Sequence, residues 1–187
     1  MKQNANSIKP GNIIEHQNKL WRVVNTQHTM PGKGGAFVQM ELKDAVTGTK
    51  LNERFRSSED LERVRLDQKN FQYLFGDAER VTVMDMETFE QQELDIEIFG
   101  DQSVYLQDGM QIIVESHEGK PLGVELPDSV TLEVSETEGV VKGQTAASSN
   151  KPAVLENGVK TMVPTFVEAG DKIIVKTADG SYVERAK

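Results

Sequence analysis

Apolar and polar residues alternate in short runs along most of the chain, a pattern typical of half-buried β-strands. The clearest runs cover residues 13–16, 20–24 and 37–42. They are separated by turn-forming pairs such as Gln17-Asn18, Thr47-Gly48 and Asp179-Gly180. Short helical pieces are expected only at residues 57–62 and 100–106, and no long amphipathic helix is predicted. The pattern therefore predicts an all-β protein.

One internal similarity bears on the domain organisation. Residues 109–119 align with residues 170–180 at a constant offset, and Gly, Ile, Ile, Val and Gly are identical in the two segments. Either two hairpins are alike by chance, or a small barrel of about 60 residues is repeated. We infer three consecutive small β-barrels, over residues 1–65, 66–127 and 128–187, because closure of a sheet into a barrel removes exposed strand edges.

The stretch M-P-G-K-G-G-A-F at residues 30–37 lies between two strand-like arms, residues 20–28 and 36–44. At about 3.3 Å per residue, nine-residue arms project the tip of such a hairpin by about 30 Å. Pro31 restricts the backbone, while Gly32, Gly34 and Gly35 remove side chains that crowd Lys33. The sequence predicts an accessible amine at the end of a slim finger.

Other interpretations of this stretch are a plain solvated turn, a phosphate-binding loop and a catalytic lysine. The Walker pattern fails because Gly34 follows Lys33 and no helix begins behind it. A catalytic lysine needs burial or a neighbouring charge to lower its pKa, and a glycine-rich tip supplies neither. On the residues alone, the solvated turn and the functional tip both stay open.

Charge distribution matters more than the net charge of -9 over 187 residues. Residues 1–64 hold 10 Lys and Arg against 7 Asp and Glu, whereas residues 65–127 hold 4 against 14. A basic end of the chain is suited to a polyanion, and the acidic middle to solvent. The chain has no Cys, which rules out disulfides and thiolate chemistry, and no apolar run of membrane-spanning length. We expect a cytoplasmic protein that does not interact with membranes.

The stretch Pro31-Gly32-Lys33-Gly34-Gly35-Ala36-Phe37, followed by Thr47-Gly48-Thr49, resembles bacterial translation elongation factor P. Residues 84–91 resemble the middle segment of that family, and residues 141–143, 163–167, 170–171 and 177–185 resemble its C-terminal signature. The matches occur in order over nearly the whole chain. The chain departs from the family pattern at Gln144, where an acidic residue is commoner, and in the linker at residues 146–150.

The resemblance implies an SH3-like, KOW-type barrel followed by two OB-type barrels in an elongated L shape. It also implies a monomeric, non-enzymatic factor without a cofactor or metal. Such a factor binds both ribosomal subunits between the P and E sites, beside the P-site peptidyl- or initiator tRNA. It stimulates peptide-bond formation and relieves stalling at consecutive prolines. Lys33 corresponds to the family's tip residue, which a lysyl-tRNA-synthetase-like enzyme extends in many bacteria.

Further RNA contacts are expected from scattered basic and aromatic residues. In the first barrel these are Lys43, Lys50, Arg54 and Arg56; in the third they are Tyr182 and Arg185, which match family positions near small-subunit RNA. The alternatives are solvated side chains and, for Tyr182, structural packing. A general single-strand nucleic-acid-binding OB protein is the competing function, but it requires clustered aromatics. An enzyme requires a nucleophile and base near Lys33, and none is present.

Overall fold

The computed structural model describes residues 1–139 and 150–187 of the chain. The family-like residues 141–144 and most of the linker at 146–150 therefore lie outside the described residues. The chain divides into two compact units, the first comprising residues 1–68 and 115–123 and the second residues 69–114 and 124–187. Nearly all regular structure is β, as predicted. Within the described ranges, no helix is long and apolar enough to span a membrane.

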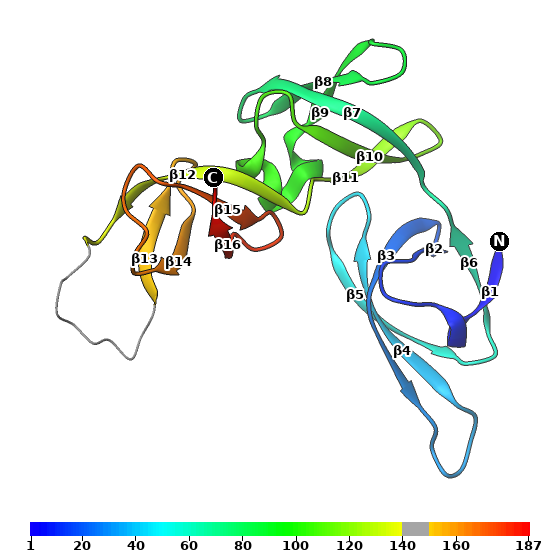
Figure 1. Cartoon of the computed structure of the whole chain (residues 1–187). Helices are drawn as coiled ribbons and strands as arrows, with labels where there is room; N and C mark the ends of the chain where they lie inside the picture. Colours follow the sequence, from blue (N-terminus) through cyan, green and yellow to red (C-terminus); the bar gives the residue numbers. More distant parts are fainter. Residues whose placement is uncertain (140–149) are drawn as a thin grey trace. The chain divides into compact units, whose positions relative to one another are not determined.

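The first sheet has six antiparallel strands in the order β1-β6-β2-β3-β4-β5 and curls around its own apolar core (Figure 1). Ile14, Val38, Met40 and Leu42 are fully buried in that core, and Trp21 packs with them while donating its indole N–H to the His16 carbonyl. The elements are β1 (Lys2–Asn4), the 3-10 helix η1 (Ala5–Ser7), β2 (Ile13–His16), β3 (Lys19–Thr29), β4 (Phe37–Asp44), β5 (Lys50–Arg56) and β6 (Asp60–Val64).

Strands β3 and β4 form the long hairpin that the alternation predicts, and it extends beyond the rest of its sheet (Figure 1). Along β4 the burial alternates, so that Val38, Met40 and Leu42 face the core while residues between them face outward. A register shift between Val23 and Asn25 inserts one extra residue in β3. Such a bulge increases local twist and bends the strand.

The prediction of a helical turn at residues 57–62 is wrong. Residues Ser57 to Glu59 make a tight turn, in which the Glu59 carboxylate accepts a hydrogen bond from the Arg56 N–H at 3.2 Å. Strand β6 then begins at Asp60 and pairs with β1 and β2. The Ser-Ser-Glu-Asp signal of a helix start is used here to close a turn, because pairing with two strands satisfies the following backbone better than an isolated helical turn.

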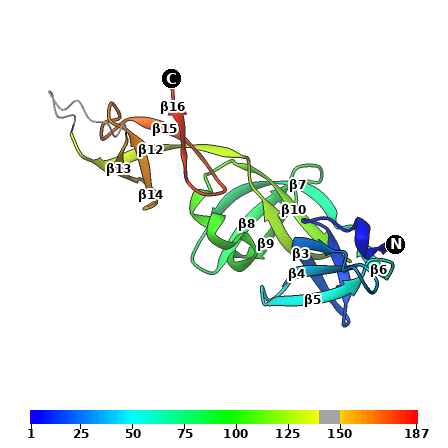
Figure 2. The ribbon, with the colours of Figure 1, turned by 90° about the horizontal axis from the view of Figure 1, so that it is seen from below.

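The second and third sheets, seen from a second direction in Figure 2, share one strand order. When the strands of each sheet are numbered in chain order, their order across the sheet is fifth, fourth, first, second, third. The second sheet contains β7 (Asp67–Gly76), β8 (Arg80–Asp85), β9 (Gln91–Asp95), the 3-10 segment η2 (Ile96–Tyr105), β10 (Gln111–His117) and β11 (Lys120–Glu125). The third contains β12 (Ser129–Thr137), β13 (Asn150–Leu155), β14 (Lys160–Pro164), β15 (Lys172–Lys176) and β16 (Tyr182–Arg185).

The internal similarity in the sequence corresponds to this shared topology. Residues 109–119 contain β10 and residues 170–180 contain β15, and these are the fourth strands of their respective sheets. The glycines that bracket both segments have positive φ. The two matching segments therefore occupy the same position in a repeated strand arrangement. The short helix expected at 100–106 overlaps the second half of η2, which ends at Tyr105.

The second and third sheets also share one apolar cluster, which holds residues of both. Gln107 donates a side-chain hydrogen bond to the Thr131 carbonyl at 2.6 Å, and Asn157 donates one to the Val104 carbonyl at 3.0 Å. Each of the three sheets begins within one of the segments 1–65, 66–127 and 128–187. We retain those boundaries as a proposal for the domains.

Candidate nucleic-acid interface

The tip of the β3–β4 hairpin is an open loop of residues 30–36, because the last paired residues are Thr29 and Phe37. Lys33 is exposed, and Met30 is 85% exposed. In the part of the chain that the structure describes, no hydrogen bond or ion pair engages the Lys33 side chain. The amine predicted at this tip is therefore presented to solvent and not held against its own barrel.

The three glycines of the tip differ in backbone conformation. Gly34 has φ of +107°, which an L-residue adopts only with strain, whereas Gly32 and Gly35 lie outside that range. A Cβ added at any of the three positions meets no atom within 4 Å. Folding thus accounts for glycine at position 34 only. At 32 and 35, the missing side chains leave room for something outside this chain.

The four basic residues predicted in the first barrel do lie together. They alternate along β4 and β5 with the buried positions, and the register pairs Lys43 with Lys50 across the two strands. Arg54 and Arg56 continue the same outward face toward the hairpin tip. We name this surface, formed by Lys43, Lys50, Arg54 and Arg56, the basic face. Lys50 is partly neutralised, since its Nζ lies 3.7 Å from Glu41 Oε1.

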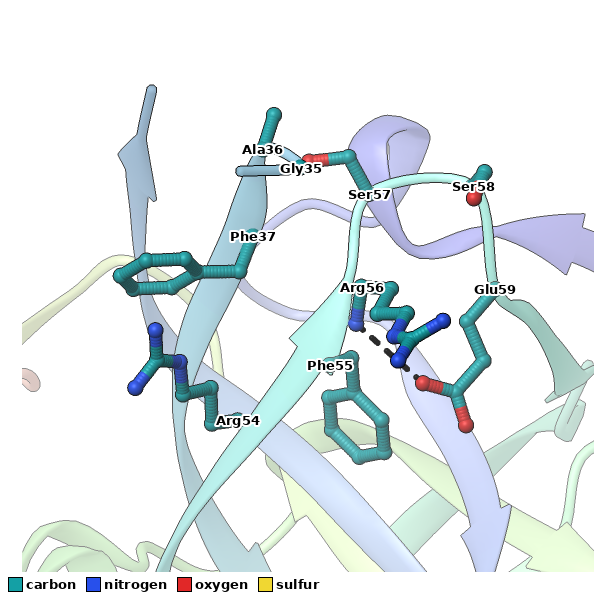
Figure 3. A pocket seen from close by; sticks show the side chains of 9 residues that line it. All are labelled: Gly35, Ala36, Phe37, Arg54, Phe55, Arg56, Ser57, Ser58 and Glu59. Carbon is teal, nitrogen blue, oxygen red and sulfur yellow. Dashed lines mark hydrogen bonds between the residues drawn. The ribbon is translucent and has the colours of Figure 1, made fainter. Parts of the chain in front are cut away.

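A groove at the tip end of the basic face is shown in Figure 3, lined by residues 35–37 and 54–59. The guanidinium carbon of Arg54 lies 3.4 Å from the centre of the Phe37 ring, a cation–π contact that holds the guanidinium plane in place. Among the described residues, neither Arg54 nor Arg56 enters an ion pair. Their N–H donors therefore remain open to a phosphate.

Phe37, Ser57, Ser58 and Glu59 also line this groove, although none of them was predicted as a contact residue. Phe37 is directly opposite Arg56 and diagonal to Arg54 in the strand register. Once that register is known, the alternation of side chains along β4 places Phe37 on the outer face. The sequence alone does not fix the register, so it could not predict the contact between Arg54 and Phe37.

The turn that joins β4 to β5 is fixed by Asp44, a buried carboxylate at the other end of the basic face. Its Oδ1 accepts hydrogen bonds from the N–H groups of Val46 at 2.8 Å and Thr47 at 3.1 Å. Burial alone raises the pKa of Asp44, but these donors and the nearby Lys19 charge outweigh it and leave the pKa below its ordinary value. Asp44 is therefore a structural anion that holds β4 and β5 in register.

Tyr182 and Arg185 lie on β16, in the second compact unit, and are not part of the basic face. Tyr182 is half-buried and packs against the apolar cluster. Arg185 is exposed, with its guanidinium 3.9 Å from the Asp171 carboxylate and 5.5 Å from the centre of the Phe166 ring. The predicted contact residues are therefore divided between the two compact units.

The described residues provide no set of side chains that could bind a metal ion. Over residues 1–139 and 150–187, no group of three or more His, Asp or Glu side chains is placed to hold a metal ion. What the first unit offers instead is a free cation on a finger and a groove of stacked and unpaired guanidinium groups. This combination is suited to binding a polyanion by its backbone.

Comparison with known proteins gives matches to three family models in chain order. The Elongation factor P (EF-P) KOW-like domain matches residues 4–61, the Elongation factor P (EF-P) OB domain residues 66–124, and the Elongation factor P, C-terminal model residues 130–185.

Relatives of the same family match over the full length of both chains. The proteins named Elongation factor P from Parvibaculum lavamentivorans and Brucella canis are 59% and 54% identical to this chain over 186 residues. Among solved structures, eukaryotic translation initiation factor 5A from Methanococcus jannaschii aligns with a TM-score of 0.51 at 23% identity, covering 66% of this chain and 95% of its own. That likeness concerns the fold alone.

Proposed function

The chain belongs to the elongation factor P family of translation factors, and we propose that it binds the ribosome between the P and E sites, beside the P-site tRNA. There it stimulates peptide-bond formation and relieves stalling at consecutive prolines. The observation that carries this proposal is the exposed, unpaired Lys33 at the end of the β3–β4 hairpin. A narrow finger with a cation at its end fits a confined, RNA-lined site.

Proline explains why such help is needed. Its ring fixes φ and removes the backbone N–H, so consecutive prolines restrict the nascent chain to a few geometries. When these geometries keep the reacting atoms apart, peptide transfer is slow. A factor that holds the tRNA end in a reactive position lowers the entropic part of the barrier, an effect worth several kcal/mol without any chemistry by the factor.

In this account, each part of the first unit has its own task. Lys33 supplies a flexible cation with several donors for RNA oxygens at the tip, and the glycines at 32 and 35 let RNA approach the backbone closely. The groove of Phe37, Arg54 and Arg56 takes a phosphate, since the stacked guanidinium is already oriented. Such contacts recognise the shape and phosphates of RNA and are independent of its base sequence.

We also propose that Lys33 is extended by a lysyl-tRNA-synthetase-like enzyme and that the protein acts as a cytoplasmic monomer without a cofactor. The exposure of the tip supports modification, because an enzyme has to reach the amine from outside. A longer side chain carries the cation further from the loop, which suits a target beyond the hairpin itself.

The test is reconstituted translation of a message with three consecutive prolines. Ribosomes stalled on this message are supplied with the protein isolated from its own host, with Lys33→Ala, or with Lys160→Ala as a control for loss of an exposed lysine elsewhere. We expect the parent and Lys160→Ala to restore full-length product and Lys33→Ala to fail. Equal rescue by Lys33→Ala contradicts the proposed role of the tip.

A further inference from the structure

Three turns of this chain share one backbone hydrogen-bond pattern. In each, the first residue donates its N–H to the carbonyl of the sixth and accepts from the N–H of the fifth, at 2.8–2.9 Å. The turns cover residues 44–49, 85–90 and 176–181. In all three the fifth residue has left-handed backbone, with φ of +76° at Gly48, +62° at Phe89 and +75° at Gly180.

Phe89 therefore stands where the two sibling turns use glycine. A bulky L-residue in this conformation is a strained exception. The ring is 68% exposed and is not among the side chains that pack against the apolar cluster. Neither folding nor packing accounts for Phe89, and residues held in disfavoured backbone conformations concentrate at functional positions.

Hydrogen bonds within the turn order the backbone that carries Phe89. Asp85 Oδ1 accepts hydrogen bonds from the N–H groups of Glu87 at 2.8 Å and Thr88 at 3.2 Å, and the Glu90 N–H reaches the Thr88 hydroxyl at 3.4 Å. A pre-ordered loop loses little entropy on binding, which favours its use as an anchor.

The charge around Phe89 indicates what kind of partner it meets. Its turn contains Asp85, Glu87 and Glu90 and no Lys or Arg. Lys69 approaches Asp85 from outside the turn, but residues 65–127 hold 14 carboxylates against 4 basic residues. A nucleic-acid backbone is repelled by such a surface, whereas a basic protein is attracted to it.

We propose that Phe89 is an aromatic anchor that inserts into an apolar pocket, rimmed by Lys and Arg side chains, on a protein of the ribosome. This inference rests on the proposed function and extends it to a contact that does not involve the Lys33 tip. Buried aromatic anchors of this kind commonly dominate the affinity of an interface, and the carboxylates of the turn pair with the basic rim.

The first experiment measures affinity for purified ribosomes. Phe89→Asn removes the ring but tolerates left-handed backbone, Phe89→Trp keeps an aromatic ring, and Phe75→Asn is a control for loss of a similarly exposed aromatic, at 62%. We expect Phe89→Asn to weaken binding at least about 5-fold, and the other two variants to change it less than about 2-fold. The thermal midpoint of Phe89→Asn should not fall, since the substitution relieves strain.

Unchanged ribosome binding by Phe89→Asn overturns the anchor, and a marked drop in its thermal midpoint shows that Phe89 serves the fold instead. Failure of the parent to bind ribosomes contradicts the proposed function, and this inference with it. The second experiment places the photoreactive residue p-benzoylphenylalanine at position 89 in the full chain and irradiates the ribosome complex. Crosslinks to a basic ribosomal protein are expected. Crosslinks to RNA alone, or none, overturn the protein partner.

Discussion

Alanine substitutions at the three tip glycines should separate the demands of folding from those of function. Gly34 alone has left-handed backbone, with φ of +107°, while a Cβ at Gly32, Gly34 or Gly35 meets nothing within 4 Å. None of the three substitutions therefore creates a clash within the protein. Any loss of activity in Gly32→Ala or Gly35→Ala has to come from contact with a partner.

The expected stability changes follow from two opposing effects. Alanine restricts the unfolded chain relative to glycine, which stabilises the folded state by about 0.4–1 kcal/mol where the native backbone suits it. At Gly34 the left-handed backbone costs alanine about 1–2 kcal/mol, which exceeds that gain. We expect Gly34→Ala to be destabilised by up to about 1.5 kcal/mol, and Gly32→Ala and Gly35→Ala to be unchanged or slightly stabilised.

Urea denaturation followed by tryptophan fluorescence measures this directly. Trp21 is the only tryptophan of the chain and is buried in the core of the sheet that carries the hairpin, so its signal reports on that sheet. The same variants are then added to ribosomes stalled on a triple-proline message. We expect Gly32→Ala and Gly35→Ala to lose at least about 10-fold in the rate of rescue, because small displacements of a positioning group are costly.

Two results refute this reasoning. If Gly32→Ala and Gly35→Ala both rescue translation like the parent, the backbone of the tip is not closely approached by RNA. If Gly34→Ala unfolds at the same urea concentration as Gly32→Ala, the left-handed conformation at position 34 is not maintained in solution. The first result concerns the site and the second the fold, so the two are separable.

Three further predictions concern the groove, the β4–β5 turn and the shared core. Phe37→Leu removes the ring that holds the Arg54 guanidinium and should weaken ribosome binding about 2–5-fold. Arg54→Ala should weaken binding and also reduce its salt dependence by about one ion. Filter binding at several salt concentrations measures both effects. Burial raises the pKa of Asp44, but the N–H donors of its turn lower it by more, so the pKa in the folded protein is below its ordinary value. The Asp44 carboxylate therefore stabilises the fold above about pH 4, and this stabilisation is lost as the pH falls through the lowered folded pKa. Asp44→Asn should cost about 1–2 kcal/mol at pH 7 and flatten the acid limb of the urea midpoints, and an unchanged acid limb argues against this role. Gly180 has φ of +75°, and a Cβ added there would lie 2.6 Å from the Tyr105 hydroxyl. Gly180→Ala should therefore lower the calorimetric midpoint of the second unit, and Tyr105→Phe should partly restore it. Full stability of Gly180→Ala alone would contradict this close contact between Gly180 and Tyr105.

Local patterns in the sequence predicted the elements that depend on near neighbours. The alternation of apolar and polar residues from Phe37 to Asp44 predicted the second strand of the hairpin, and β3 extends only one residue beyond each end of the predicted first arm. The run of Pro and Gly at 31–35 likewise marked the tip. These signals work because side-chain direction in a strand alternates with a period of two, whatever the strand pairs with.

Features that depend on pairing between distant segments were not predictable in the same way. The stack of Arg54 on Phe37 needs the β4–β5 register, and the turn at Ser57 follows from β6 pairing with two strands. The left-handed backbone of Phe89 is even less visible, because two equivalent turns use glycine there. In each case tertiary structure overrides the local preference of the residue.

Directed hydroxyl-radical cleavage from the hairpin tip tests the central claim most directly. The chain has no Cys, so Met30→Cys provides a unique attachment point for an iron chelate beside an intact Lys33, and Lys160→Cys is the control. In ribosomes stalled at consecutive prolines, we predict cleavage of the 3′-terminal nucleotides of the P-site tRNA from position 30 and none from position 160. Retained rescue activity without cleavage at the tRNA 3′ end would contradict the account.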